Sequence, residues 1–258
     1  PKSLMLADTS RRRFEGHPAA NRGSITSRLL MAAGMTLVTL ASLGSVAEAV
    51  TKTWTGGGGD GLWATSTNWS PAGAPATTDQ VVLDNSTVLT SYTVTLPTGA
   101  VQTIITRLTI TPTGAINITL TLPSGNTFGG ASLGGLQVGD ATALTDDIIL
   151  NSGAILKNSS GGSAGNGIQV DLTGGICRIN NGGRYIHNTA RSTAGIVPLL
   201  STVAGTELGE YEQDSPGVVS ASPSFSGRTY GSLTLTRSAG SATYTVSGSS
   251  ACTVRGNF

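Results

Sequence analysis

The 258-residue chain is long enough to bury a sizeable core, and its composition argues against a helical protein. Glycine accounts for 36 residues and charged residues for only 11%, a profile typical of many short strands joined by turns. After Ala49 the chain has 9 basic and 11 acidic residues, a balance of about −2, which excludes a basic nucleic-acid-binding surface from that part.

An export leader is predicted over residues 1–49. A basic n-region precedes an uncharged apolar run of 15 residues at 29–43, and Ala47-Glu48-Ala49 then matches an A-x-A cleavage signal. The run is shorter than the roughly 20 residues that cross a bilayer, so we expect cleavage after Ala49 and no membrane span afterwards. A retained anchor is the alternative. Residues 10–14, S-R-R-R-F, resemble the twin-arginine motif and leave Sec and twin-arginine export both open.

Residues 50–90 are predicted to form an N-terminal aromatic cap. All three tryptophans of the chain, Trp54, Trp63 and Trp69, lie in this segment, separated by Gly, Asn and Pro residues that favour tight turns between very short strands. We expect the indole rings to cover the end of a stack of strands that would otherwise be wet.

The same segment carries a family resemblance. W-T-G-G begins at Trp54, G-x-W at Gly61 and N-W-S at Asn68, and Asp79 precedes the apolar strand Q-V-V-L. This order resembles the opening of large bacterial proteins with autotransporter-associated β-strand repeats. The resemblance implies an all-β fold, a parallel β-helix (β-solenoid) that is secreted or displayed at the cell surface. It implies no particular chemistry, because the family has none in common.

Residues 91–258 are predicted to be β-solenoid repeats. Period-two alternation over 92–96, 116–122, 168–172, 233–235 and 244–246 puts apolar residues on one face of each strand. Turn motifs place Gly99, Gly125, Gly153 and Gly182 at intervals of 26, 28 and 29 residues, the size of one coil. Gly114 would mark a second corner. The strings ILNSGAILKN from residue 149 and RINNGGRYIHN from residue 178 align at an offset of 29.

The C-terminal part is less regular. Residues 191–228 break the alternation and are expected to form a longer loop or an irregular rung. The strings Y-x-x-L-x-L from Tyr230 and V-x-G-N-F from Val254 resemble bacterial surface solenoids. Because the pattern stops at the apolar Phe258, we expect the chain to be the N-terminal portion of a longer protein.

Several motifs match catalytic or metal-binding strings without their usual context. G-x-G-x-x-G at residues 56–61 and G-x-S-x-G at residues 161–165 have no following helix in the pattern, so we expect loops. His187, the one histidine after the leader, could bind zinc with Cys177 and Cys252, but close ligand spacing is absent. We expect an exposed histidine in a turn and small buried apolar cysteines, although export would also permit a disulfide.

The carboxylates are the stronger functional candidates. Glu210, Glu212 and Asp214 share one face if that stretch is extended, and Asp146 and Asp147 come just before a strand. Either group could bind calcium, or act as acid and base on a glycosidic bond. The alternative is a solvated strand face and a turn.

From these patterns we predict no catalytic, cofactor-binding or metal-binding residue. The predicted function is a noncatalytic spacer or adhesin-like module that contacts carbohydrate or cell-surface proteins. A polysaccharide lyase or glycosidase is the main alternative, and a calcium-stabilised wall protein is another.

Overall fold

The computed structural model describes residues 49–130, 133–162, 165–214, 220–221, 225–238, 243–244 and 248–258. These residues belong to one compact unit, Ser45–Phe258. The predicted leader up to residue 48, and Ser163 of the G-x-S-x-G string, lie outside the described residues. None of the described helices is long and apolar enough to span a membrane.

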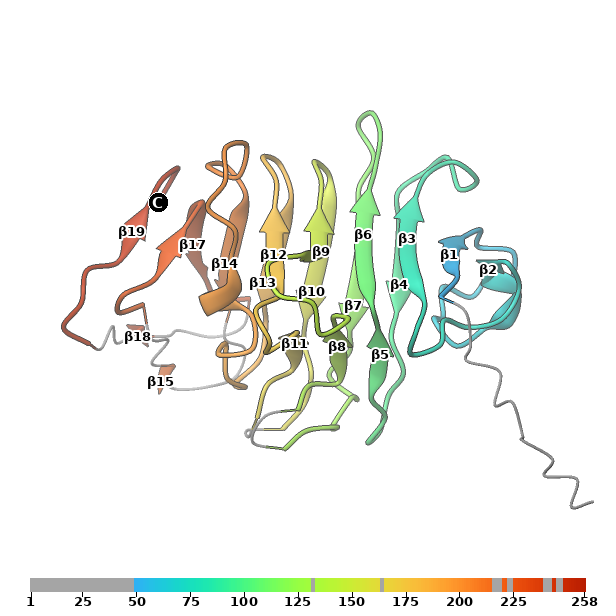
Figure 1. Cartoon of the computed structure of the whole chain (residues 1–258), viewed down its shortest axis with the longest axis horizontal. Coiled ribbons are helices and arrows are strands. Elements are labelled where there is room, and N and C mark those ends of the chain that lie inside the picture. The colour runs from blue at the N-terminus through green and yellow to red at the C-terminus, as the bar shows by residue number, and fades with distance from the viewer. Residues whose placement is uncertain are drawn as a thin grey trace, which may run out of the picture. The chain divides into compact units, whose positions relative to one another are not determined.

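Nearly all regular secondary structure of the described residues is β-strand, which confirms the all-β prediction. Its helices are two single 3₁₀ turns, η1 (Ser66–Asn68) and η2 (Val197–Leu199). Three sheets contain most of the strands, and their members lie side by side in Figure 1.

Sheet 1 consists, in spatial order, of β2 (Trp69–Ser70), β1 (Thr51–Trp54), β3 (Gln80–Asp84), β6 (Arg107–Thr111), β9 (Asp146–Leu150) and β12 (Ile176–Ile179). Sheet 2 consists of β4 (Tyr92–Thr95), β7 (Ile118–Leu122), β10 (Ala154–Asn158), β13 (Arg184–His187), β14 (Glu210–Asp214) and β17 (Ser232–Thr236). Sheet 3 consists of β5 (Thr103–Ile105), β8 (Leu136–Val138) and β11 (Ile168–Val170). Two short pairs join β15 (Ser220–Ala221) to β18 (Thr243–Tyr244) and β16 (Thr229–Tyr230) to β19 (Thr253–Val254).

The chain visits the three sheets in a fixed order. β3, β4 and β5 belong to sheets 1, 2 and 3, and the same sequence of sheets recurs for β6 to β8 and for β9 to β11. Each strand pairs in parallel with the strand one cycle earlier, as Thr119 does with Ile155 and Ile155 with Arg184. The pairing of Ile149 with Arg178 and of Ile155 with Arg184 confirms the predicted offset of 29 residues.

The predicted series of turn glycines, Gly99, Gly125, Gly153 and Gly182, combined residues from two different corners of the coil. The amide of Gly99 donates to the carbonyl of Gly125 at 2.7 Å, whereas the amide of Gly153 donates to the carbonyl of Gly182 at 2.9 Å. Gly161, not Gly153, follows Gly125 at its corner, because its amide donates to the carbonyl of Asn126 at 2.9 Å. The step from Gly125 to Gly153 was therefore wrong, since glycine is common enough for unrelated corners to match in spacing.

Rows of stacked side chains form the core. In sheet 2 one inward row comprises Val94, Leu120, Leu156, Tyr185, Tyr211 and Leu233, all buried. In sheet 1 the matching row is Val81, Leu108, Ile148 and Cys177. Full burial of each large apolar side chain contributes about 1.5–3 kcal/mol, and each needs neighbours above and below to be covered.

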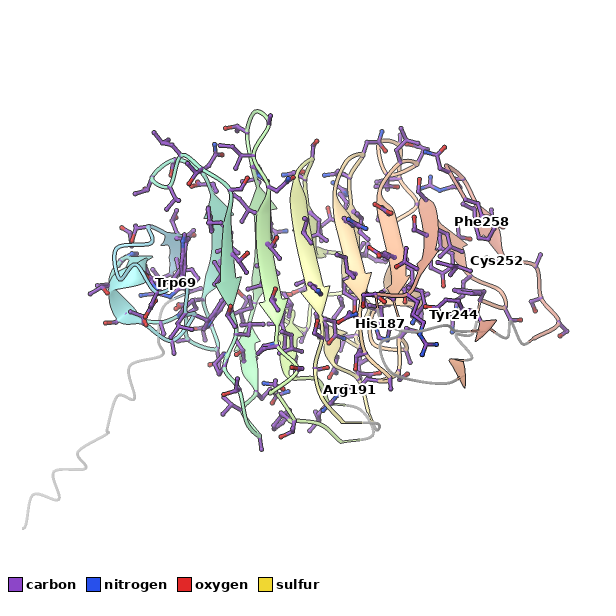
Figure 2. All side chains as sticks on the ribbon, turned by 180° about the vertical axis from the view of Figure 1, so that it is seen from behind. Trp69, His187, Arg191, Tyr244, Cys252 and Phe258 are labelled. Carbon is purple, nitrogen blue, oxygen red and sulfur yellow. The ribbon has the colours of Figure 1, made fainter. Side chains whose placement is uncertain are left out.

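The tryptophan segment covers the first strands of two sheets. β2 pairs antiparallel with β1 at the edge of sheet 1, and the amide of Trp63 donates to the carbonyl of Thr95 at the edge of sheet 2, at 2.9 Å. Trp54, Trp63 and Trp69 are 2%, 3% and 3% exposed, which confirms their predicted burial. Figure 2 shows Trp69 at the opposite end of the unit from Phe258.

Two predictions about the C-terminal part need correction. The segment 191–228 was expected to be irregular, yet it contains β14, a regular member of sheet 2 whose one apolar residue is Tyr211. Cys177 is buried in β12 as expected, whereas Cys252 is exposed, and both are free thiols. Cys252 lies just before β19, the last described strand.

Candidate functional site

A polar groove crosses the beginning of four neighbouring strands of sheet 2. It has room of about 260 Å³, and its lining comprises Asn117, Gly153, Ala154, Ile155, Gly182, Gly183, Arg184, Leu208 and Glu210. These residues lie just before or at the start of β7, β10, β13 and β14. The groove therefore runs along the direction in which the strands stack.

Glycines keep the floor of this groove bare. Gly153 and Gly182 have φ of 81° and 82°, a left-handed conformation that side chains disfavour. A Cβ at Gly183 would lie 2.5 Å from the carbonyl oxygen of Leu150. Close approach of the backbone at this corner thus requires residues without side chains, and the amides of Gly153, Gly182 and Gly183 all donate to backbone carbonyls.

A charged cluster lies beside the groove on the outer face of sheet 2. Nε of Arg184 lies 3.2 Å from the carboxylate of Glu210, and its Nη2 contacts Oε2 of Glu212. The hydroxyls of Thr234 and Thr236 donate to the carboxylates of Glu210 and Glu212, respectively. Because β13, β14 and β17 are adjacent in register, this cluster extends over three rungs.

The structure brings only part of the predicted carboxylate set together. Glu210 and Glu212 share Arg184, and they point outward from β14 as predicted. Asp214, two residues further on, is 5% exposed and accepts from Nδ2 of Asn188 at 2.6 Å. Asp146 and Asp147 belong to β9 in sheet 1, a different sheet.

Asp146 and Asp147 lie within a strand, not before one. Asp146 is bonded to Nη2 of Arg178 at 3.0 Å. Ile176 faces Asp146 while Cys177 faces Ile148, so Asp147 is the extra residue of a bulge. The bulge was not recognisable because the two aspartates precede the apolar run without a turn signal.

The Asp147 carboxylate is enclosed by protein. Its Oδ1 accepts from the Thr145 hydroxyl at 3.0 Å, while Oδ2 is buried without a hydrogen-bond partner among the described residues. Burial raises the pKa of Asp147 to about 6; the charges of Asp171 and Asp140 add to the rise, and the Thr145 hydroxyl opposes it. A Cβ on Gly175 would lie 1.9 Å from Oδ2, so glycine backbone covers this oxygen. The raised pKa marks a buried group, not one that faces a groove.

His187 is buried in β13, so its predicted place in an exposed turn was wrong. It is 1% exposed and forms one inward row with Asn158 and Gln213. Nε2 lies 2.9 Å from the carbonyl oxygen of Arg191 and therefore carries the proton. Burial lowers the pKa of His187 to about 4. The alignment at offset 29, which pairs His187 with Asn158, was the signal that could have placed it in a strand.

Arg191 is a buried cation that sequence reasoning missed. It is 4% exposed; its Nε donates to the carbonyl of Gly161 at 2.6 Å and its Nη1 to that of Asn166 at 3.3 Å. Burial lowers its pKa. Figure 2 shows Arg191 below His187. The guanidinium hydrogen bonds connect the segment after β13 to the segment between β10 and β11.

The remaining predicted strings take no part in a site among the described residues. The G-x-G-x-x-G string follows β1 but leads only to the single 3₁₀ turn η1, so no helix of a dinucleotide site follows it. Within the described ranges, no group of three or more His, Cys, Asp or Glu side chains is arranged to hold a metal ion.

Comparison of the chain with known protein families, curated proteins and solved structures found no match.

Proposed function

We propose that the chain is an exported, noncatalytic module of a bacterial surface or secreted protein, built as a parallel β-helix, with a spacer or adhesin-like role. The predicted export leader of residues 1–49 and the resemblance of residues 54–83 to bacterial surface proteins support export from the cell. One observation supports the parallel β-helix most strongly. The chain passes repeatedly through sheets 1, 2 and 3, and each strand runs parallel to the strand one cycle earlier.

The ligand class follows from the chemistry of the groove. The Arg184–Glu210 ion pair and the exposed Asn117 side chain offer donors and acceptors, with charges of both signs. Such a surface suits the hydroxyl groups of a carbohydrate, or the backbone of an extended surface protein, better than it suits a phosphate backbone. The three tryptophans are buried, so sugar stacking on indole rings does not contribute.

A binding experiment tests this assignment. The protein is applied to an array of bacterial surface polysaccharides, and retention is compared for the wild type, Arg184→Ala and Glu210→Gln. We expect retention to fall at least about tenfold in both variants, equivalent to 1.4 kcal/mol. Arg178→Ala is the matched control, because it removes a similar ion pair from sheet 1 and should bind normally. Equal losses in all three variants would contradict a site at the groove.

The proposed export is tested by expressing the full chain in a bacterium with an intact export pathway. The exported protein should begin at Val50, and Ala49→Arg should retain the leader, whereas Ala49→Gly should be processed normally. A full-length product confined to the cytoplasm would contradict the proposal.

A polysaccharide-degrading enzyme is the alternative function. The observation that favours it is the pair Glu210 and Glu212, which flank one guanidinium at the groove. In that case the polysaccharides retained on the array should be shortened with time, and Glu212→Gln should abolish shortening while leaving retention intact. Retention without shortening supports the noncatalytic module.

A further inference from the structure

The backbone nitrogen next to the predicted cleavage site is directed at a buried carboxylate. The amide of Val50 donates to Oδ1 of Asp79 at 3.3 Å, and Asp79 is only 4% exposed. Oδ2 of Asp79 accepts from the amide of Ala76 at 2.8 Å. Val50 itself is 37% exposed, so the contact lies at the border between solvent and core.

Both donors to Asp79 are neutral amides. The described residues provide no ion-pair partner for this carboxylate; the closest basic residue in sequence, Lys52, instead donates its ammonium to the carbonyls of Pro71 and Ala72 at 3.0 and 3.2 Å. A buried carboxylate that lacks a counter-charge is unfavourable, and a cation within hydrogen-bond distance would relieve this cost.

We propose that removal of the leader between Ala49 and Val50 turns this contact into an ion pair between the new α-ammonium of Val50 and the Asp79 carboxylate. The step is hydrolysis by a leader peptidase: water adds across the C–N bond, Ala49 takes the carboxyl group and Val50 the amine, which gains a proton at neutral pH. The inference deepens the proposed function and rests on its cleavage assignment.

The ion pair would fasten the first strand of sheet 1. The carbonyl of Val50 already accepts from the amide of Gln80 at 2.9 Å, and Thr51 then faces Gln80 in the parallel pairing of β1 with β3. Trp54 lies at the other end of β1. Processing would therefore fix the first end of β1, whose other end is already held by the buried Trp54.

The charged groups around the Val50 amine and the titration of this amine determine how the stabilisation by the ion pair depends on pH. Besides Asp79 and Lys52, the neighbouring strands contribute Arg107, which faces Gln80 and donates to the carbonyl of Asp146. An unperturbed α-amine titrates near about 8, and a carboxylate partner raises that value. While the carboxylate is ionised, the stabilisation is therefore complete below about pH 8 and is lost as pH rises through the raised value of the amine.

The experiment compares three forms: the full chain, residues 49–258 and residues 50–258. The two shorter forms retain the sheets and core, which lie within the unit Ser45–Phe258. At pH 6 we expect the form that starts at Val50 to melt about 2–4 °C higher than the form that starts at Ala49, with the gap closing above about pH 10. The Ala49 form keeps an amide at Val50, as the full chain does. Equal melting of the two short forms at every pH would overturn the inference.

Asp79→Asn separates the ion pair from the structural role of the side chain. In this background the two short forms should melt alike, because the neutral amide cannot form the ion pair and both forms lose the same acceptor oxygen. If Asp79→Asn does not fold, the titration of a ¹⁵N-labelled Val50 amine in the wild type decides: a pKa above that of a free α-amine is expected, and an unshifted one overturns the pair.

These measurements use purified forms with defined ends, so they do not depend on export. Cleavage in the cell at a different bond would contradict the proposed function. Cleavage at Val50 without a difference between the short forms would contradict only the ion pair.

Discussion

The interior of sheet 2 changes character along the stack, and the two halves are held together differently. Near the tryptophan end its rows are apolar, as in Val94 and Leu120. Further along, one row passes from Leu122 through Asn158, His187 and Gln213 to Leu235. The same parallel pairing accommodates both apolar and polar inward rows, because the buried polar groups form hydrogen bonds.

This difference predicts that the stability of the two regions responds to different changes. At the tryptophan end the contacts are between rings, with Trp69 centred 5.0 Å from Trp54 and 4.9 Å from Trp63. In the polar half the buried groups include a titratable imidazole, His187. The first region should respond to loss of volume, and the second to pH.

The largest effect is expected at the tryptophan end. Trp69→Ala removes both ring contacts and the 2.8 Å hydrogen bond from Nε1 to the carbonyl of Trp63, so it should cost about 3–5 kcal/mol in urea unfolding. Leu89→Ala is the control: Leu89 is 73% exposed, so its loss should change stability by less than about 0.5 kcal/mol. Equal stability of both variants would mean that the rings do not cover the stack.

The polar half should lose stability in mild acid. His187 titrates at about 4 when folded and at 6.5 in the reference state, so only the unfolded chain binds its proton between these values. Stability should therefore fall by roughly 3 kcal/mol as pH drops from 6.5 to 4, and His187→Gln should remove this contribution. A His187→Gln variant with an unchanged pH profile would contradict the burial of a neutral imidazole.

Asp147 should act in the opposite direction over the same range. Its pKa is raised from 3.8 to about 6, so its contribution to stability is fully present below pH 3.8 and is lost as pH rises through about 6. Asp147→Asn should therefore raise the melting temperature at pH 7 and steepen the acid loss that arises from His187. Melting curves between pH 4 and 7 measure both effects, and a lower melting temperature at pH 7 would contradict the enclosed carboxylate.

A smaller contrast separates two glycines of one corner. Gly114 and Gly153 have φ of 73° and 81°, but a Cβ would meet nothing within 4 Å at Gly114, whereas at Gly153 it would lie 2.4 Å from the carbonyl oxygen of Ile116. Gly114→Ala should cost about 1–2 kcal/mol and Gly153→Ala about 2–4 kcal/mol by urea unfolding. Equal costs would show that the backbones do not approach closely at this corner.

The parts predicted well from sequence are those where apolar residues alternate or tryptophans cluster. Period two predicted β4, β7 and β17, and the aligned strings from residues 149 and 178 predicted the register of β10 with β13. In these segments burial follows from hydrophobicity alone, so the residue types carry the information.

The polar half was harder to predict because burial there depends on partners far along the chain. His187 is buried through contacts with the carbonyl of Arg191 and the hydroxyl of Tyr185, which its own residue type does not reveal. The place of β14 in sheet 2 was not predicted for the same reason, since the charges of E-Y-E-Q-D suit a solvated stretch unless Arg184 pairs with Glu210 and Thr234 donates a hydrogen bond to it. The groove was not predicted because the spacing of Gly153 and Gly182 shows that they stack but not that the neighbouring backbones enclose a hollow.

The parallel register between successive cycles is the central claim, and paired-cysteine cross-linking tests it most directly. In a Cys252→Ser background, Thr121→Cys with Lys157→Cys joins register partners one cycle apart, whereas Thr121→Cys with Ile155→Cys is offset by two residues. We expect mild oxidation to link the first pair rapidly and the second pair slowly, as judged by mass spectrometry of the linked peptides. Preferential linking of the second pair, or no linking of the first, would contradict it.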